Sequence, residues 1–175
     1  MYKIVTKKEL NPTVTLMEID APHIAKKAKP GQFIILRIDE KGERIPLTIS
    51  DYNPEKGTVT IIFQIVGATT SRLNKLNEND CILDFAGPLG TPSHLEGVKK
   101  ACVIGGGLGT AIAYPQAKAL HNMGAEVDVI TGFRNKDLVI LEDEFKAASD
   151  VMKLMTDDGS HGEKGLVTNA LEELI

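Results

Sequence analysis

The glycine-rich segment GGGLG at positions 105–109 constrains the fold of this chain more than any other feature. An apolar run at 101–104 precedes it, and a helical pattern from Thr110 to Met123 follows, which Gly124 ends. Glycines permit a tight reversal between a strand and a helix, and without a Cβ they let the backbone approach a ligand closely. The N-terminus of the helix offers unpaired N–H groups and a positive dipole end, which suit a phosphate. The segment therefore predicts a strand–loop–helix unit with a phosphate site at the loop.

Three details leave this interpretation open in part. Thr110 stands where the third glycine of the GxGxxG pattern is expected, and no acidic residue closes the next strand, where the ribose of NAD is usually held. Arg134 follows that strand instead, and it is explained equally well as a contact to a 2′-phosphate, which favours NADP, or as a surface arginine. Glycines that only form a tight turn remain the alternative for the loop.

The second half of the chain alternates between strand and helix patterns. Such alternation predicts a parallel sheet with helices on its faces. About half of a doubly wound sheet is present, so we expect an incomplete α/β domain over residues 97–175. The expected elements are strands at 101–104, 126–131 and 151–155, and helices at 110–123, 141–148 and 168–175.

The first half shows short strands at near-regular spacing with turn signals between them. This pattern predicts a closed antiparallel barrel of six strands over residues 1–96, with one short helix at 70–76. The alternation is clearest in TVTLMEID, from Thr13 to Asp20. The expected strands are 2–7, 13–20, 32–38, 45–50, 58–66 and 81–85.

The segment Arg44-Ile-Pro-Leu-Thr-Ile-Ser50 has the residue types that a flavin needs. An arginine fork suits a pyrophosphate better than lysine does, because its planar guanidinium binds in a bidentate way. A hydroxyl four residues later, at Thr48, can approach N5 of the isoalloxazine, and Pro46 stiffens the strand between them. An edge strand that carries an arginine and a threonine is the alternative explanation.

Composition excludes several classes of function. The net charge of −4 and the pI near 5.6 disfavour binding to nucleic acid or to anionic membranes. No apolar run is long enough to span a bilayer, and the first residues lack the apolar region of a secretory signal, so we expect a cytoplasmic protein. Cys81 and Cys102 lack a CxxC or Cys/His pattern, so we expect no metal site and no iron–sulfur cluster held by this chain alone.

Four segments in order resemble the ferredoxin–NADP reductase superfamily. They are RIPLTIS, then QIVG with the hydroxyl residues after it, then GPLG, then GGGLGTAIAYPQAKAL. Their order and their residues are most similar to those of the electron-transfer subunits of the dihydroorotate dehydrogenase type. The small subunits of NADH-dependent ferredoxin:NADP oxidoreductase and of sulfide dehydrogenase are close kin. The resemblance covers essentially the whole chain.

The resemblance implies an FAD site in the barrel and an NAD(P) site in the α/β domain. In the barrel it places Arg44 on the FAD pyrophosphate. Pro46, Leu47 and Thr48 would lie along the isoalloxazine, with Thr48 as the catalytic position near N5. The backbone of Ile65, Val66 and Gly67 would contact the flavin, and Thr69 or Thr70 would contact its phosphate side. In the α/β domain it places Gly105, Gly107, Leu108, Gly109 and Thr110 on the nicotinamide nucleotide. It also places Asp157 to Ser160, which include Gly159, and Gly162 to Thr168 against the ribose and the nicotinamide, although the residues of DDGS alone favour an ordinary turn. His161 lies within this loop, where a surface or capping role is the simpler interpretation.

The resemblance also implies electron transfer. NAD(P)H would pass a hydride to FAD, and single electrons would leave towards an iron–sulfur centre or a larger oxidoreductase subunit. Family members continue for about another hundred residues, a domain-scale length, and end in cysteines that hold a [2Fe–2S] centre. Those cysteines are absent from this sequence. A flavoprotein that does not use a nucleotide and a non-catalytic docking module for a larger dehydrogenase subunit are the alternatives.

Overall fold

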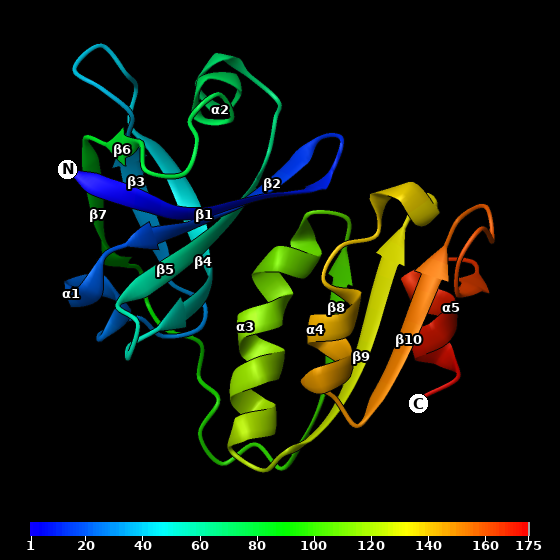
Figure 1. Cartoon of the computed structure of the whole chain (residues 1–175). Helices are drawn as coiled ribbons and strands as arrows, with labels where there is room; N and C mark the ends of the chain where they lie inside the picture. The colour runs from blue at the N-terminus through cyan, green and yellow to red at the C-terminus, as the bar shows by residue number, and fades with distance from the viewer. Residues whose placement is uncertain (175) are drawn as a thin grey trace. The chain divides into compact units, whose positions relative to one another are not determined.

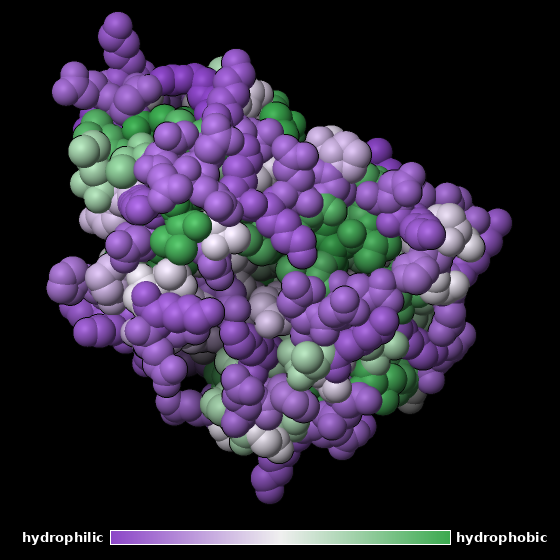
Figure 2. Space-filling model, viewed as in Figure 1, coloured by the Kyte–Doolittle hydropathy of each residue, from purple (hydrophilic) through white to green (hydrophobic). Residues whose placement is uncertain are grey.

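The computed structural model describes residues 1–174 and divides into two compact units (Figure 1). The first, Met1–Ser93, is called the barrel unit here, and the second, which begins at His94, is called the sheet unit. No helix among residues 1–174 is long and apolar enough to cross a membrane. Figure 2 shows a largely hydrophilic face with separate apolar patches.

The barrel unit is built on an antiparallel sheet. Its strands lie in the order β6-β1-β2-β5-β4-β3-β7. Two short helices, α1 (Pro22–Ala25) and α2 (Ala68–Leu73), connect them. The strands are β1 (Tyr2–Asn11), β2 (Val14–Asp20), β3 (Phe33–Arg37), β4 (Ile45–Asn53), β5 (Thr58–Gln64), β6 (Cys81–Ile82) and β7 (Asp84–Leu89).

The two ends of this sheet are joined through a single residue. Strands β6 and β7 lie at opposite ends of the strand order, yet only Leu83 separates them in the chain. Strand β6 pairs with β1, and β7 pairs with β3, so the sheet is nearly closed into a barrel. The predicted antiparallel barrel is confirmed, but it has seven strands rather than six, because the predicted strand 81–85 changes its partner at Leu83.

The core of the barrel follows from the alternation of its strands. Ile34 and Leu36 of β3 and Ile49 of β4 are almost fully buried, and they belong to one cluster that also includes Phe63 and Phe85. Because alternate residues of a strand point to opposite faces, the residues between them lie on the outer face. The predicted flavin residues Pro46 and Thr48 lie on this outer face of β4.

The sheet unit has a parallel sheet in the order β11-β10-β9-β8. This confirms the predicted α/β arrangement. Strand β11 and the 3₁₀ turn η1 have no counterpart in the sequence prediction, and Ile175, the end of the predicted last helix, lies outside the described residues. The elements are β8 (Lys100–Gly106), α3 (Gly109–Asn122), β9 (Glu126–Phe133), η1 (Lys136–Leu138), α4 (Glu142–Ala147), β10 (Val151–Thr156), β11 (Glu163–Lys164) and α5 (Val167–Glu172).

Helices cover both faces of this sheet, as Figure 1 shows. Ile130 of β9 and Met155 of β10 pack against Ala170 of α5 on one face. Helix α3 contacts β8 and β9, and helix α4 contacts β10. The two helices also contact each other. Because the strands are parallel, their carboxyl ends lie at one edge, and the loops after β8, β9 and β10 meet there.

Candidate functional site

Strand β4 presents the predicted flavin residues on its outer face. Ile45 and Leu47 pack against the buried core, so Pro46 and Thr48 point the other way, and Arg44 precedes the strand in the same phase. Leu47 therefore contacts the core rather than the outer face. Arg44 and Thr48 are about 13 Å apart along the strand and lie on one side of it.

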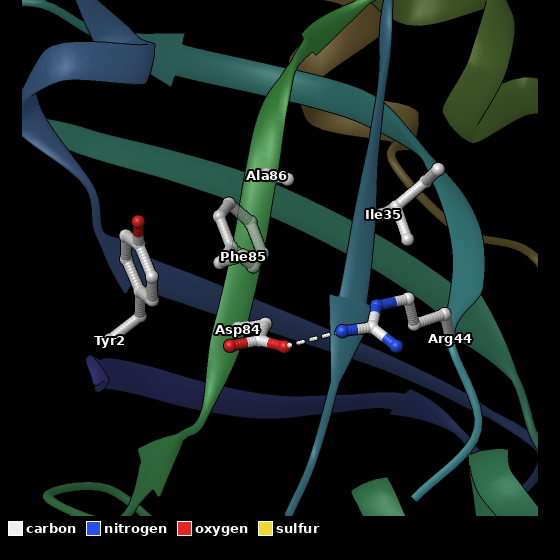
Figure 3. Close-up of a pocket in the computed structure, with 6 residues that line it drawn as sticks. All are labelled: Tyr2, Ile35, Arg44, Asp84, Phe85 and Ala86. Atoms are coloured by element: carbon white, nitrogen blue, oxygen red, sulfur yellow. Dashed lines mark hydrogen bonds and ion pairs between the residues drawn. The ribbon is translucent and has the colours of Figure 1, made fainter.

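A pocket of about 280 Å³ lies next to Arg44. Its lining also includes Tyr2 and Phe85, whose ring centroids are 5.6 Å apart, and Thr48 is outside it. Figure 3 shows Arg44 and Asp84 pointing toward one another across its floor. The complete lining is Tyr2, Ile35, Arg44, Asp84, Phe85 and Ala86.

Asp84 holds two arginines with one oxygen. Its Oδ2 accepts a hydrogen bond from Nε of Arg37 at 2.7 Å and another from Nη2 of Arg44 at 3.3 Å. The side chain of Arg37 is 23% exposed, whereas that of Arg44 is 62% exposed. The Arg44 fork is thus oriented by a carboxylate while much of it faces solvent, where it can meet an anionic ligand.

The turn before α2 uses several of its own hydrogen-bonding groups. The Thr70 hydroxyl accepts from the backbone N–H of Val66 and of Gly67, at 3.0 and 3.1 Å, and donates to the Gly67 carbonyl. The Ile65 N–H donates to the carbonyl of Thr13. Thr70 therefore caps α2 in this structure, and these three N–H groups are occupied within the barrel unit.

Two contacts bring the turn at α2 close to the segment that carries Arg44. The Thr69 hydroxyl donates to Oε2 of Glu43 at 3.0 Å, and Arg72 forms an ion pair with Asp39. Both partners belong to the loop between β3 and β4. The structure thus brings together Arg44 and Thr69, two predicted pyrophosphate contacts that are 25 residues apart in the sequence.

The glycine loop after β8 has one glycine that packing requires and one that the backbone conformation favours. An added Cβ at Gly105 would lie 2.8 Å from the Cα of Thr110, so the strand and the helix could not approach as they do. Gly107 has a φ of +52°, a left-handed conformation that other residues seldom adopt. The buried Thr110 hydroxyl donates to the Gly107 carbonyl at 2.6 Å and closes the turn.

Gly106 and Gly109 have no such reason within the protein. An added Cβ at either would meet no atom within 4 Å, and neither has a positive φ. Leu108 occupies the N-cap of α3 and gives it no side-chain hydrogen bond. Open space beside bare backbone at an uncapped helix N-terminus fits the phosphates of a nucleotide.

The loops after β9 and β10 complete the same edge. Asp157 and Asp158 donate their N–H groups to the carbonyls of Phe133 and Arg134, at 3.0 and 3.4 Å, so the two loops run together. The Arg134 side chain is exposed. Hydrogen bonds from Ser160 to the carboxylate of Asp158 lower the pKa of Asp158, which keeps a negative charge in this loop.

Sequence reasoning missed Asp84 and Glu43, which form hydrogen bonds with the predicted flavin residues Arg44 and Thr69. Asp84 is an outward polar position in a predicted strand, but nothing in the sequence connects it with Arg44, 40 residues away.

Among the described residues no group of three or more histidine, cysteine, aspartate or glutamate side chains could hold a metal.

Comparison with known proteins gives relatives along the whole chain. No family model matches. An uncharacterized protein in the adh 3′ region of Clostridium beijerinckii is 53% identical over all of this chain and 62% of its own length. A dihydroorotate dehydrogenase B (NAD(+)) electron transfer subunit homolog of Thermotoga maritima is 46% identical over the same shares. The electron transfer subunit of Streptococcus mutans is 35% identical over 98% of this chain and 67% of its own.

Solved structures agree with these relatives. The structure of an NADH-dependent reduced ferredoxin-NADP oxidoreductase superposes with a TM-score of 0.92 at 44% identity, over 99% of this chain and 63% of the other. The ferredoxin reductase in carbazole 1,9a-dioxygenase, at 18% identity and a TM-score of 0.82, shows likeness of fold alone. This chain spans about 62% of the length of the first two relatives.

Proposed function

The chain belongs to the electron-transfer subunits of dihydroorotate dehydrogenase B within the ferredoxin–NADP reductase superfamily, and from this premise we propose that it is the flavin- and nucleotide-binding part of an electron-transfer oxidoreductase. The barrel unit binds FAD, and the sheet unit binds NADH or NADPH. Such a protein would take electrons from the nucleotide by way of the flavin and deliver them singly to an iron–sulfur centre or to a larger partner subunit.

The observation that carries this proposal is the outer face of β4. The Arg44 fork, held by Asp84, would bind the FAD pyrophosphate with two charge-assisted hydrogen bonds. Pro46 and Thr48 on the same face would lie along the isoalloxazine, and the Thr48 hydroxyl would reach N5. FAD held there would supply the redox chemistry, because a flavin can accept a hydride and release electrons one at a time.

In the sheet unit, the bare backbone at Gly106 and Gly109 supports binding of the nucleotide phosphates. The loop with Asp157 and Gly159 would lie against the ribose and the nicotinamide. Arg134, exposed after β9, would meet the 2′-phosphate if NADPH is the donor. The residues bind and orient the nucleotide, and no protein acid or base is needed for the hydride transfer.

The absorption spectrum of the purified chain tests this proposal. We expect flavin bands that bleach on anaerobic titration with NADH or NADPH, and the donor that bleaches them at lower concentration identifies the preferred nucleotide. A colourless protein that does not take up added FAD would contradict the flavin assignment. Flavin bands that neither nucleotide bleaches would instead indicate a flavoprotein of another kind.

Gly109→Ala separates the nucleotide site from a simple turn. Alanine is favoured over glycine in helices by up to about 1 kcal/mol, and no protein atom obstructs a methyl group at this position. A pure turn would therefore keep its stability or gain some. If phosphates approach this backbone, the methyl group obstructs them, and we expect the Kd for the nucleotide to rise about ten-fold or more.

Thermal unfolding and nucleotide titration of the same Gly109→Ala sample give both readings. Because stability and affinity should move in opposite directions, a general loss of folding cannot imitate the expected result. An unchanged nucleotide Kd would place the phosphates elsewhere.

A further inference from the structure

A histidine in the proposed nucleotide loop is tied to helix α4. Nε2 of His161 lies 2.8 Å from Oε2 of Glu142, the first residue of α4. The other carboxylate oxygen of Glu142 accepts from Nζ of Lys146 at 2.7 Å. The carboxylate thus connects the helix with a loop that follows β10, across 19 residues of sequence.

The backbone of His161 is fixed as well. The Thr156 hydroxyl, at the buried end of β10, donates to the His161 carbonyl at 2.7 Å and lies 3.3 Å from its N–H. On the other side, the Ser160 hydroxyl accepts from the N–H of Lys136 at 2.8 Å. The hydrogen bond between the His161 ring and Glu142 therefore acts on a loop, residues 157–162, whose backbone is also held at His161 and whose Ser160 side chain is bonded to Lys136.

The start of α4 is held in an unusual conformation. Leu141, the N-cap residue, is buried and has a φ of +59°. A left-handed conformation costs a residue with a Cβ about 1–2 kcal/mol, so the surroundings must fix it. Glu142 follows this fixed residue directly and stands in the first turn of α4.

The contact does not depend on one protonation state of the imidazole. The hydrogen bond from Lys146, and a smaller contribution from His161, lower the pKa of Glu142, so its carboxylate is charged near neutral pH. A neutral imidazole protonated at Nε2 and an imidazolium can both donate to it.

From this geometry we infer that Glu142 is a positioning residue for the nucleotide loop, and that it acts through His161. The inference rests on the proposed function, because the loop of residues 157–162 is the segment proposed to contact the ribose and nicotinamide. Glu142 does not touch the nucleotide. It holds the loop in the conformation that the nucleotide requires, so that binding does not have to order it.

The experiment compares Glu142→Ala, His161→Ala and the double variant in the flavin-containing chain. We expect each single variant to raise the KM for the preferred nucleotide about three- to ten-fold, with the rate of flavin reduction at saturation unchanged. The double variant should be no worse than either single one, because both remove the same contact. Glu142→Gln retains an acceptor oxygen and should stay within about two-fold of the wild type.

Lys100→Ala is the matched control. It removes the exposed ion pair with Glu126 and a longer one, of 4.0 Å, with the buried Asp128. Both lie at the amino-terminal ends of the strands, away from the loop of residues 157–162, so the KM should be unchanged. Hydrogen exchange of residues 157–162 gives a reading that does not depend on flavin chemistry, and it should be faster in both alanine variants.

The proposed function and the positioning role of Glu142 can be refuted separately. A wild-type chain that binds no nucleotide would refute the proposed function. A wild-type chain that is reduced normally, with an unchanged KM and unchanged exchange in Glu142→Ala and His161→Ala, would refute the positioning role alone. Additive effects in the double variant would also contradict it.

Discussion

Arg44→Ala is expected to be purified almost without FAD. Arg44 is the cationic residue among the six described residues that line the pocket, and each hydrogen bond from a charged donor contributes about 1.5–3 kcal/mol. Loss of a two-bond contact to the pyrophosphate should raise the Kd for FAD at least about 100-fold. The measurement is the ratio of flavin to protein absorbance, followed by titration of the apoprotein with FAD.

Two variants make this result specific. Arg44→Lys keeps the charge but loses the fork, so its affinity for FAD should lie between those of wild type and alanine variant. Lys56→Ala removes an exposed cation of the barrel unit at the turn between β4 and β5, away from the proposed pyrophosphate contacts, and should retain its flavin. Full flavin occupancy in Arg44→Ala would remove the central support for the proposed function.

Gly162→Ala is expected to destabilise the sheet unit by about 3 kcal/mol. Gly162 has a φ of +66°, and an added Cβ would lie 2.1 Å from the carbonyl oxygen of Leu154 in β10. Backbone cannot move aside as a flexible side chain can, so the connection from β10 to β11 has to shift. The unfolding temperature of this unit should fall by roughly 12–24 °C, as followed by circular dichroism.

Gly159→Ala is the control within the same loop. Its φ of +76° imposes a similar conformational cost, but an added Cβ meets only the side chain of Lys164, at 3.1 Å. We expect a loss of about 1–2 kcal/mol, from the left-handed conformation alone. Equal losses in Gly159→Ala and Gly162→Ala would show that the close contact with Leu154 is not what destabilises the second variant.

The fold was largely predictable because its patterns are local. Alternation in the segment from Thr13 to Asp20, and the strand–glycine–helix order around Gly105, depend on neighbours in the sequence. The split at Leu83 was not predictable, since five residues with strand character do not reveal that the two halves pair with different strands. Strand β11, with two residues, is too short to produce a pattern.

The candidate site was predictable only as residue types. Arg44 and the glycines were recognisable because few other residues can do what they do. Their supports were not, because Asp84 and Glu142 act on partners 40 and 19 residues away, and exposed carboxylates are common in this chain. Such contacts depend on which strands become neighbours, which the local pattern does not determine.

Leu83, the single residue between β6 and β7, lies next to the residue that orients Arg44 for a ligand. Asp84 follows Leu83 directly, so the carboxylate that orients Arg44 stands at the point where the chain passes from β6, paired with β1, to β7, paired with β3. If β6 detaches from β1, the same movement loosens Asp84. A ligand that binds Arg44 therefore stabilises the closed barrel, and its binding free energy adds to the free energy of unfolding of the barrel unit.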